Sequence, residues 1–570
     1  MNILLCGINA KYIHTNIAIR QIKGYVEQNS NYKINIIEYT INNYINEILE
    51  AIYKHKPDVL GLSCYIWNIE IVKKLVVLIK KVLPETIIIL GGPEVSYNSV
   101  AIFSEVPCDY IISGEGEEAF CELLSAIKNN SGFENVGGIS YICNGKILST
   151  KKEKALDMCF LPFPYKNFSE IENKICYYEA SRGCPFGCRY CLSSIEKGVR
   201  FAPIEKVKKE LKIFLDNKAQ QVKFVDRTFN CNKRFAIEII KFIIENDNGY
   251  TNFHFEVESS ILDDETLELL STARRGLFQL EIGVQSTNEA TLKAIDRKND
   301  MEWLKNCLYV LQKNQNIHIH LDLIAGLPLE DYESFKKSFN DVFTHEPHQL
   351  QLGFLKVLKG SSMEKLCSQY DIKYSPYPPY EVLSTDCLTY DEILKLKGVE
   401  EMVEVYYNSN RFYNSLRYLL THFENAFDMF YQMSLYKDKK GTGSVVHNKQ
   451  FAYTFMIEFA QGSNVNIDMK SFKTKLLLDY LCHEKPRSIP DWAPVNLLNK
   501  NNIYDLVVRE NRVSEYLPEY SDCDSKQLLK LIHIERFSLN PFNLSDKPIT
   551  VIFNYRRKGY WGNATAIPIE

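Results

Sequence analysis

The stretch EASRGCPFGCRYCLSS, residues 179–194, decides how the rest of this 570-residue sequence is interpreted. It places three cysteines, Cys184, Cys188 and Cys191, in a C-x3-C-x2-C spacing among glycines and a proline. A structural zinc site takes four protein ligands, and an iron–sulfur cluster is normally held by four cysteines. No further cysteine or histidine follows in this loop. The spacing therefore favours a cluster with one open iron over a zinc ion or three unlinked cysteines.

Strand-like and helix-like segments alternate from about residue 170 to residue 360 around this stretch. ICYYEASRGC reads as a strand that runs into the cysteine loop, and EKVKKELKIFLDN reads as the helix after it. About six such units predict a full or partial (β/α) barrel domain over residues 165–375. The active site of such a barrel lies at the carboxyl ends of its strands. We therefore expect the cysteine loop to open onto that face.

Residues 1–150 form a separate alternating series with nearly continuous apolar strands such as TIIILGG. Apolar strands joined by helices predict a doubly wound parallel sheet covered on both faces. Ligands of such sheets bind beyond the carboxyl ends of the strands, where glycines also serve simply as tight turns. The candidate ligand-binding residues at these ends are Asn9, Ser63, Gly91, Gly92, Gly114, Glu115 and Gly116.

The remaining segments carry no recognisable chemical motif. Residues 151–168 are charged and then punctuated by prolines, which predicts a linker. Residues 376–570 read as a mostly helical domain, with a strand predicted near its end in PITVIFNYRRK. The whole chain is thus predicted to be an α/β protein with three domains.

The bulk composition is that of an ordinary globular protein. The formal net charge is −4, from 67 basic and 71 acidic side chains, and no basic stripe or tail is present. This balance argues against nucleic acid as a partner. No apolar stretch reaches the ~18–20 residues of a membrane span, and the first residues lack a basic signal-peptide region. We expect a cytoplasmic protein whose thirteen other cysteines are mostly buried, reduced thiols.

The segment CPFGCRYC resembles the signature of radical S-adenosylmethionine enzymes, in which an aromatic residue precedes the last cysteine. The resemblance covers roughly residues 165–380. It implies that Cys184, Cys188 and Cys191 ligate a [4Fe-4S] cluster whose fourth iron chelates S-adenosylmethionine. In that family, reduction of the cluster cleaves the sulfonium and yields a 5′-deoxyadenosyl radical. A low-potential electron donor of flavodoxin or ferredoxin type and an anaerobic cytosol are therefore expected.

Other positions match the pattern of that family less sharply. Tyr190 stands where the family has an aromatic residue near adenine, and Asp226 stands where the amino group of the cofactor is bound. Glu256 matches an acid that hydrogen-bonds the ribose, Gln285 a polar residue near the cofactor, and Gly326 a point of close backbone approach to adenine. The alternative for each residue is a structural role at the end of a strand.

The N-terminal series, with ILGGPEV and SGEGEEAF, resembles the B12-binding domain of cobalamin-dependent radical S-adenosylmethionine enzymes. Ser63 and the pair Gly91–Gly92 match the serine and glycines of that fold, and imply that the strand ends hold cobalamin. The histidine-ligand motif D-x-H-x-x-G is incomplete, because Tyr12 and Ile17 flank His14 in place of Asp and Gly. The resemblance therefore does not extend to His14 as a cobalt ligand.

Residues 376–570 resemble an uncharacterised domain found at the C-terminus of one subgroup of these enzymes. The resemblance of the first two domains to cobalamin-dependent radical S-adenosylmethionine enzymes implies radical methyl transfer to an unactivated carbon of a small-molecule or otherwise unknown substrate. The alternatives are a radical cyclisation, rearrangement or oxidation without methyl transfer, or a non-catalytic redox or cobalamin sensor. The fold does not specify the substrate.

Overall fold

The chain divides into two compact units in a computed structural model. The first unit contains residues 1–331 and 353–389, and the second contains residues 332–352 and 390–570. The cysteine loop and the N-terminal sheet therefore belong to one unit. The residues described are 1–151, 154–195, 198–441, 449–486, 488–494, 498, 502–503, 515–520, 523–558 and 563–569.

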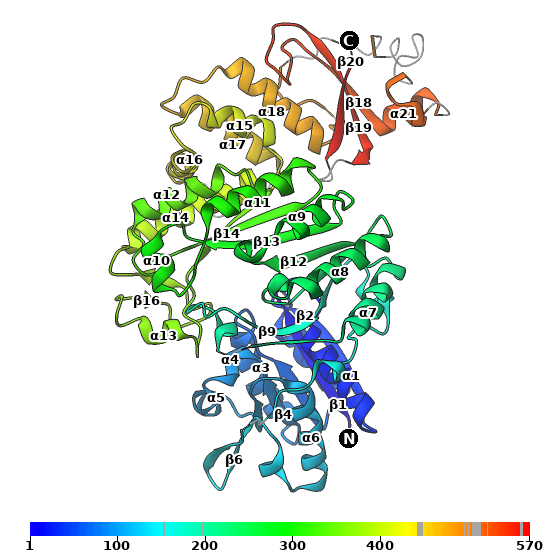
Figure 1. Cartoon of the computed structure of the whole chain (residues 1–570), viewed down its shortest axis with the longest axis vertical. Helices are drawn as coiled ribbons and strands as arrows, with labels where there is room; N and C mark the ends of the chain where they lie inside the picture. Colours follow the sequence, from blue (N-terminus) through cyan, green and yellow to red (C-terminus); the bar gives the residue numbers. More distant parts are fainter. Residues whose placement is uncertain are drawn as a thin grey trace. The chain divides into compact units, whose positions relative to one another are not determined.

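A seven-stranded sheet with the order β2-β1-β3-β4-β5-β6-β7 forms the N-terminal part, drawn in blue to cyan in Figure 1. The strands from β2 to β5 in this order pair in parallel, and β6 and β7 add antiparallel pairs. The order reverses between β1 and β3, and doubly wound sheets bind their ligands at such a reversal. The predicted doubly wound sheet is confirmed. Its elements are β1 (Ile3–Asn9), α1 (Ile17–Asn29), β2 (Ile34–Thr40), α2 (Ile45–His55), β3 (Val59–Ser63), α3 (Ile69–Val82), β4 (Ile87–Gly91), α4 (Pro93–Ser96), α5 (Ser99–Glu105), β5 (Tyr110–Ile112), α6 (Gly116–Asn129), β6 (Ile139–Cys143) and β7 (Lys146–Ser149).

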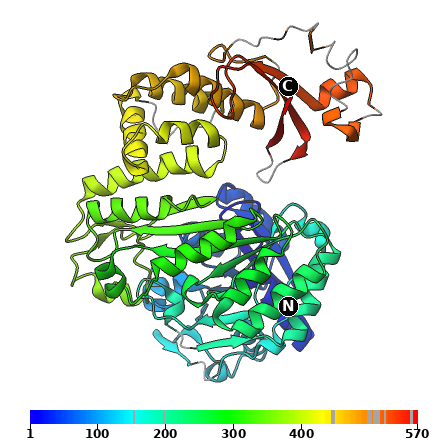
Figure 2. The same ribbon diagram turned by 45° about the horizontal axis from the view of Figure 1, so that its top comes forward.

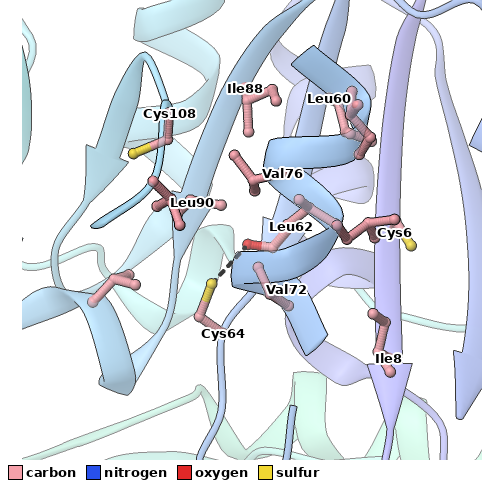
Figure 3. Packing of buried hydrophobic residues seen from close by; sticks show 14 of the residues in the cluster. Cys6, Ile8, Leu60, Leu62, Cys64, Val72, Val76, Ile88, Leu90 and Cys108 are labelled. Carbon is pink, nitrogen blue, oxygen red and sulfur yellow. Dashed lines mark hydrogen bonds between the residues drawn. The ribbon is translucent and has the colours of Figure 1, made fainter. Parts of the chain in front are cut away.

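Apolar side chains cover both faces of this sheet, as expected for a parallel sheet between helices. On the face shown in Figure 3, Leu62 and Leu90 pack in one cluster with Val76 of α3. The thiols of Cys64 and Cys108 lie in the same cluster, and the Cys64 thiol donates to the Leu62 carbonyl at 3.7 Å.

The scattered cysteines are only partly the buried thiols that the composition predicts. Cys6, Cys64, Cys108, Cys176 and Cys307 are buried outside the cysteine loop. The prediction is wrong for Cys143 and Cys159, which are exposed. Cys143 ends β6, the strand next to the sheet edge, whose last two residues are exposed.

The central part is a six-stranded sheet with the order β15-β14-β13-β12-β11-β8, and its two edge strands, β15 and β8, do not pair with each other. The predicted (β/α) barrel is therefore a partial one. Helices α7, α8, α9 and α11 follow the strands in sequence and cover one face (Figures 1 and 2). The elements are β8 (Ile175–Tyr178), β9 (Ser181–Cys184), β10 (Gly198–Phe201), α7 (Ile204–Asp216), β11 (Gln221–Phe224), α8 (Lys233–Glu245), β12 (Asn252–Val257), α9 (Asp264–Ser271), β13 (Phe278–Gln285), α10 (Glu289–Ala294), α11 (Met301–Lys313), β14 (His318–Ala325), β15 (Gln349–Phe354), α13 (Ser362–Leu366), β16 (Lys373–Tyr374) and β17 (Val382–Ser384).

The strands of this sheet present apolar side chains to the helices and polar side chains to the opposite face. In β13, Phe278, Leu280 and Ile282 are buried, whereas the alternate residues Gln279 and Glu281 are only half-buried. Successive side chains of a strand point to opposite faces, so the polar residues share one face. The inner face of this partial barrel is therefore polar.

The segment ICYYEASRGC is not one strand, as the sequence suggests, but two. β8 ends at Tyr178 in the main sheet, and β9 pairs antiparallel with β10 in a hairpin of its own. The chain turns at Ala180, whose amide donates to the buried Asp226 carboxylate at 3.0 Å. The cysteine loop thus begins at the end of a hairpin strand, one element later than predicted.

The second unit is mostly helical and has a small antiparallel sheet, as predicted for the C-terminal residues. Figure 2 shows the helices of residues 390–483 in yellow-green to orange and the three-stranded sheet, β18-β19-β20, in red. Its core includes Leu517, Ile534 and Ile552. Its elements are α12 (Tyr332–Phe343), α14 (Tyr390–Met402), α15 (Tyr413–Leu420), α16 (Ala426–Lys440), α17 (Lys449–Gly462), α18 (Met469–His483), α21 (Ser525–Leu531), β18 (Ile532–Phe537), β19 (Ile549–Lys558) and β20 (Ala564–Ile569).

Candidate functional site

The three cysteines of the loop are held in place mainly by backbone contacts. The Cys191 amide donates to the Cys188 carbonyl at 3.0 Å, which closes a tight turn between two of the thiols. The Arg189 amide donates to the Ile295 carbonyl at 3.0 Å, and the Arg189 carbonyl accepts from the Met363 amide at 2.8 Å. The loop is therefore anchored on both sides, to the segment after α10 and to α13.

The spacing of the three sulfur atoms suits a ligand larger than one ion. Within the described chain, the metal-ligating groups whose donor atoms lie within 4.8 Å of one another do not include this trio. Two thiolates on one zinc ion lie about 3.8 Å apart, given a Zn–S bond of about 2.3 Å. Three soft thiol donors, spread over one anchored loop, fit a cluster.

Arg297 connects the loop to the end of β12. Its guanidinium donates to the Cys188 Sγ at 3.7 Å and to the Glu258 carboxylate at 2.7 Å. Burial raises the pKa of the Cys188 thiol, and the positive charge of Arg297 opposes that rise. Sequence reasoning missed Glu258 and Arg297. The available signal for Glu258 was its place directly after β12, two residues beyond Glu256.

Gln285 ends β13 in a strained backbone conformation. Its φ is +68°, in the left-handed region that non-glycine residues rarely adopt. Its side-chain nitrogen folds over Gly283, where a Cβ would lie only 2.2 Å away, and its buried Oε1 has no hydrogen-bond partner. Backbone strain and an unpaired amide oxygen at a strand end are features of ligand-binding positions. They fit the predicted place of S-adenosylmethionine.

Asp226 is engaged with the strand that leads to the cysteines. Its carboxylate accepts from the Ala180 amide at 3.0 Å and from the Ser181 hydroxyl at 2.5 Å. Its side chain is 1% exposed, and burial raises the pKa of this carboxyl to about 7. These contacts give Asp226 a positioning role next to the loop, and its predicted contact with the cofactor stays a prediction.

Glu256 lies on β12, and Tyr190 lies in the cysteine loop. Burial, together with the neighbouring Glu281 carboxylate, raises the pKa of the Glu256 carboxyl. Burial also raises the pKa of the Tyr190 phenol, which the nearby Arg297 charge partly offsets. Both side chains are half-buried. Their contacts with a cofactor stay predictions.

Gly326 follows β14 with a φ of +80°, which a residue with a Cβ rarely adopts. A Cβ at this position would lie 2.6 Å from the Val382 side chain of β17. Packing of Val382 is thus sufficient to require a glycine. The predicted approach of adenine to Gly326 has no support from this contact and stays a prediction.

Two polar side chains at the switch point of the N-terminal sheet hold the loop after β1. Ser63 Oγ accepts from the Asn16 side-chain Nδ2 at 2.9 Å, and the Asn16 side-chain oxygen also caps α1. Asn9 Nδ2 donates to the His14 carbonyl and to the Glu38 carboxylate, both at 3.1 Å. Asn9 and Ser63 therefore lie near each other at the switch point, as predicted from the strand ends.

An aromatic pair that the sequence reasoning missed stands at the end of β3. The rings of Tyr65 and Trp67 stack with centroids 4.5 Å apart, and Trp67 remains 42% exposed. Trp67 is held by a hydrogen bond from its indole nitrogen to the Ile8 carbonyl at 3.0 Å. An ordered, exposed aromatic face beside the switch point fits a large, partly apolar ligand such as cobalamin. The available signal was the run CYIWN directly after Ser63.

The glycines of this sheet differ in what they do. Gly92 has a φ of +119°, and a Cβ there would lie 2.4 Å from the Cys64 carbonyl, so close backbone packing explains it. A Cβ on Gly116 would lie 3.1 Å from Ile22. Gly91 meets nothing nearer than 3.9 Å, and Gly114, at a φ of +81°, faces open space within 4 Å. Among these four glycines, Gly91 and Gly114 leave the most room for a ligand.

Glu115 and its neighbour Glu117 form ion pairs with the hairpin that carries Cys184. Arg182 of β9 contacts Glu117 at 2.5 Å, Glu179 at 2.9 Å and Glu115 at 3.4 Å. Arg200 of β10 also pairs with Glu115. The first turn of α6 is therefore attached to the cysteine hairpin, and the predicted contact of Glu115 with cobalamin stays a prediction.

His14 faces the first strand of the partial barrel. Its Nδ1 lies 2.8 Å from the Tyr177 hydroxyl, and residue 14 forms a bridge with Ile175. Burial and two lysines lower the pKa of its imidazole. This contact with Tyr177 gives His14 a structural role, in keeping with the incomplete histidine motif.

In the part of the chain that the structure describes, helices long and apolar enough to cross a lipid bilayer do not occur.

Models of three protein families match the chain in the predicted order. The B12 binding domain matches residues 3–124, and the radical SAM superfamily matches residues 178–342. The model of a family described as a protein of unknown function, DUF4080, matches residues 368–553. The predicted succession of domains is thus confirmed at the level of family, together with its implied cofactors: cobalamin, S-adenosylmethionine and a [4Fe-4S] cluster.

Several curated proteins are similar to part of the chain. The cobalamin-dependent radical SAM methyltransferase TokK of Streptomyces tokunonensis is 28% identical over 362 residues, 59% of this chain and 52% of TokK. The 2-(S-pantetheinyl)-carbapenam-3-carboxylate methyltransferase of Streptantibioticus cattleyicolor is 25% identical over 396 residues, 62% of this chain and 57% of that protein. An anaerobic magnesium-protoporphyrin IX monomethyl ester cyclase of Rubrivivax gelatinosus is 23% identical over 312 residues, 52% of this chain and 55% of that protein. The chain spans about half the length of these relatives.

Solved structures share the fold. The cobalamin-dependent S-adenosylmethionine radical enzyme OxsB, with aqua-cobalamin and S-adenosylmethionine bound, aligns with a TM-score of 0.58 at 16% identity, covering 92% of this chain and 82% of OxsB. The methyltransferase TsrM of Kitasatospora setae, with cobalamin and a [4Fe-4S] cluster bound, aligns with a TM-score of 0.56 at 13% identity, covering 67% of this chain and 79% of TsrM.

Proposed function

We propose that this chain, which belongs to the radical S-adenosylmethionine enzymes with an N-terminal B12-binding domain, transfers a methyl group to an unactivated carbon of a small molecule. Support for methyl transfer comes from the two relatives named methyltransferases, which align with more than half of this chain. The carrying observation is that the cysteine hairpin and the B12-type sheet belong to one unit and are joined through Arg182.

The residues of the cysteine loop would hold and protect the cluster. Cys184, Cys188 and Cys191 supply the thiolates, and Arg297 supplies a positive charge and a hydrogen bond beside Cys188. Gln285 offers its unpaired amide oxygen to S-adenosylmethionine. When bound, the cluster and S-adenosylmethionine would supply a carbon-centred radical that removes hydrogen from the substrate, and cobalamin would supply the methyl group.

The residues of the N-terminal sheet would hold cobalamin. Asn9, Ser63 and Gly114 lie at strand ends of the doubly wound sheet, and Trp67 presents an exposed aromatic face beside them. Asn9, Ser63 and Trp67 would contact the bound cofactor and exclude water from it, and Gly114 would leave room for it. We propose the divisions 1–150, 165–375 and 376–570 for the three functions, with a flavodoxin- or ferredoxin-type donor in the cytoplasm as the electron source.

The test uses full-length protein, reconstituted anaerobically with iron, sulfide and hydroxocobalamin, and S-adenosylmethionine labelled in its methyl group. We expect reductant-dependent release of 5′-deoxyadenosine and transfer of the label to cobalamin, both measured by mass spectrometry without the natural substrate. Cys184→Ala should abolish 5′-deoxyadenosine release but retain cobalamin. Cys159→Ala, a change at an exposed cysteine outside the loop, should keep both 5′-deoxyadenosine release and cobalamin.

The same assay separates the alternatives. Release of 5′-deoxyadenosine with no label on cobalamin would contradict methyl transfer and favour a ring-forming or oxidative reaction. The similarity to the magnesium-protoporphyrin cyclase is the observation that keeps this second candidate in view. Cobalamin binding with no cleavage of S-adenosylmethionine would instead indicate a sensor.

A further inference from the structure

Three side chains on the polar inner face of the central sheet come together away from the cysteine loop. They are His254 on β12, Glu281 on β13 and His320 on β14. Each offers one ligand atom, and the three atoms lie within 4.8 Å of one another. We propose that His254, Glu281 and His320 form a binding site for a divalent transition-metal ion, separate from the iron–sulfur cluster.

The arrangement follows from the register of three adjacent strands. Glu281 pairs with His320 across β13 and β14, and His254 lies two residues before Glu256, the partner of Glu281 on β12. All three side chains therefore point to the same face of the sheet. Because they come from rigid, neighbouring strands, the donors are held in place before any ion binds.

His254 provides the observation that points to a ligand. Its side chain is 6% exposed, and its Nε2 lies 2.9 Å from the Glu281 carboxylate. Nε2 is thus a buried nitrogen that faces a carboxylate at ion-pair distance, a contact that an ion bound between the two groups would replace. Two ligands of one zinc ion lie about 3.3 Å apart when each bond is about 2.0 Å long. The nitrogen and the carboxylate already stand near that separation.

The donor set is one that zinc and iron accept. Two imidazoles and one carboxylate, with a fourth position open, occur in zinc enzymes and in non-haem iron enzymes. The His320 Nε2 lies 2.9 Å from the side-chain amide of Gln279. An ion would bind the other ring nitrogen, Nδ1, which requires the Gln279 amide to turn its oxygen toward the Nε2–H and accept from it.

The charges around the site also favour a cation. The carboxylates of Glu256, Glu281 and Asp322 are near one another: burial together with Glu281 raises the pKa of Glu256, and burial together with both of these carboxylates raises the pKa of Asp322. The Asp322 Oδ1 has no hydrogen-bond partner. The cation in contact with Glu281 is Lys223, at 3.0 Å. Arg297 also acts on this group but is paired with Glu258, and Arg227 acts on Glu256 without a close contact.

Lys223 distinguishes the proposal from its main alternative, in which Glu281 only forms ion pairs with Lys223 and His254 and binds no metal. A divalent ion on Glu281 would have to displace the Lys223 ammonium, which its flexible four-carbon stem allows. Removal of that ammonium should therefore strengthen metal binding. If Glu281 only formed an ion pair, removal of the Lys223 ammonium would leave its carboxylate without a partner. Metal affinity would then not increase.

The test uses the full-length holoenzyme with its cluster fully reconstituted, and zinc as the probe. After equilibrium dialysis against Zn²⁺, we expect one zinc per chain by mass spectrometry. His254→Gln with His320→Gln should lose this zinc, and Lys223→Met should bind zinc at least tenfold more tightly. His422→Gln, a change in the second unit, should leave zinc binding unchanged. The same dialysis on Cys184→Ala/Cys188→Ala/Cys191→Ala protein excludes zinc held by the cysteines.

The proposal is overturned if the double histidine variant keeps its zinc, or if Lys223→Met fails to bind zinc more tightly, while circular dichroism shows both variants folded. Because zinc content is measured without turnover, this result does not depend on methyl transfer. The two proposals can fail separately. A protein that transfers methyl groups but binds no zinc contradicts only the metal site, and one that binds zinc but transfers no methyl group contradicts only the proposed function.

Discussion

At the scale of single residues, the site depends on groups that support the cofactor ligands. Asp226 holds the turn before Cys184, and Arg297 joins Cys188 to Glu258. Neither role could be predicted from the sequence, because each contact joins residues more than 30 positions apart. For Gln285, the resemblance to the family predicts a polar residue near the cofactor at the end of a strand, which stays a prediction, and its strained backbone could not be predicted from the sequence.

Replacement of Asp226 by Asn should change how stability depends on pH. Burial raises the pKa of Asp226 to about 7, well above the value near 4 of an unfolded chain. The folded state thus binds more protons than the unfolded state between these values, so the Asp226 contribution is present at low pH and is lost as the pH rises to about 7. Relative to Asp226→Asn, wild-type protein should lose about 4 kcal/mol between pH 4 and pH 8.

Thermal unfolding of the two proteins across this pH range measures the difference. Asp546→Asn, at a residue whose side chain is 88% exposed, is the matched control and should follow the wild-type curve. Parallel curves for wild type and Asp226→Asn would show that Asp226 is ionised throughout.

Replacement of Arg297 by Gln should lower the reduction potential of the cluster. The variant loses a positive charge and a hydrogen bond to the Cys188 sulfur, both of which favour the reduced, more negative cluster. A redox titration followed by electron paramagnetic resonance gives the midpoint potential. Arg189→Gln, a charge loss in the same loop, should change it less, and an unchanged potential in Arg297→Gln would contradict the assignment.

At the scale of elements, the β9–β10 hairpin is the link between the cysteine loop and α6 of the N-terminal sheet. The segment GEGEEAF reads from sequence as a ligand-binding turn, yet Glu115 and Glu117 pair with Arg182 and Arg200. Sequence pattern predicts which residues end a strand, but it does not predict which of them find a charged partner on a hairpin more than 60 residues away.

Replacement of Arg182 by Gln should destabilise the first unit markedly. Arg182 is 12% exposed, and its loss leaves Glu117 and Glu179 as nearly buried carboxylates without their main cation. Breaking such a buried pair costs about 3–5 kcal/mol. The double variant Arg182→Gln/Glu117→Gln should recover part of that loss, which a double-mutant cycle in denaturant measures. Strict additivity of the two changes would argue against a direct pair.

At the scale of the whole molecule, the two units are interleaved along the chain. The helix α12, residues 332–343, forms the end of the match to the radical SAM family, which runs to residue 342, but it belongs to the second unit. Its Phe339 contacts Phe427 and Phe430 of α16 with ring centroids 5.5 and 6.1 Å apart. The periodicity of α12 predicts a helix with one apolar face, but not the helix that this face meets. The order of strands and helices was predictable, whereas this partnership was not.

A chain shortened to residues 1–389 should be poorly soluble. It retains α12 but loses α16, so Phe339 and Phe343 become exposed, each at a cost of about 1.5–3 kcal/mol. Sedimentation of the expressed protein checks this, and Phe339→Gln/Phe343→Gln in the shortened chain should improve solubility. A soluble, cooperatively unfolding 1–389 protein would contradict the expectation.

The ion pairs of Arg182 also limit how such proteins can be recombined. The acidic side chains come from α6 and the basic ones from the hairpin that ends at Cys184, so each domain carries half of one charge network. A chimera that takes its B12-binding domain from one parent and its radical domain from another inherits mismatched halves unless the acids and arginines are transplanted together. In engineered chimeras, the two domains should therefore be exchanged together as one unit.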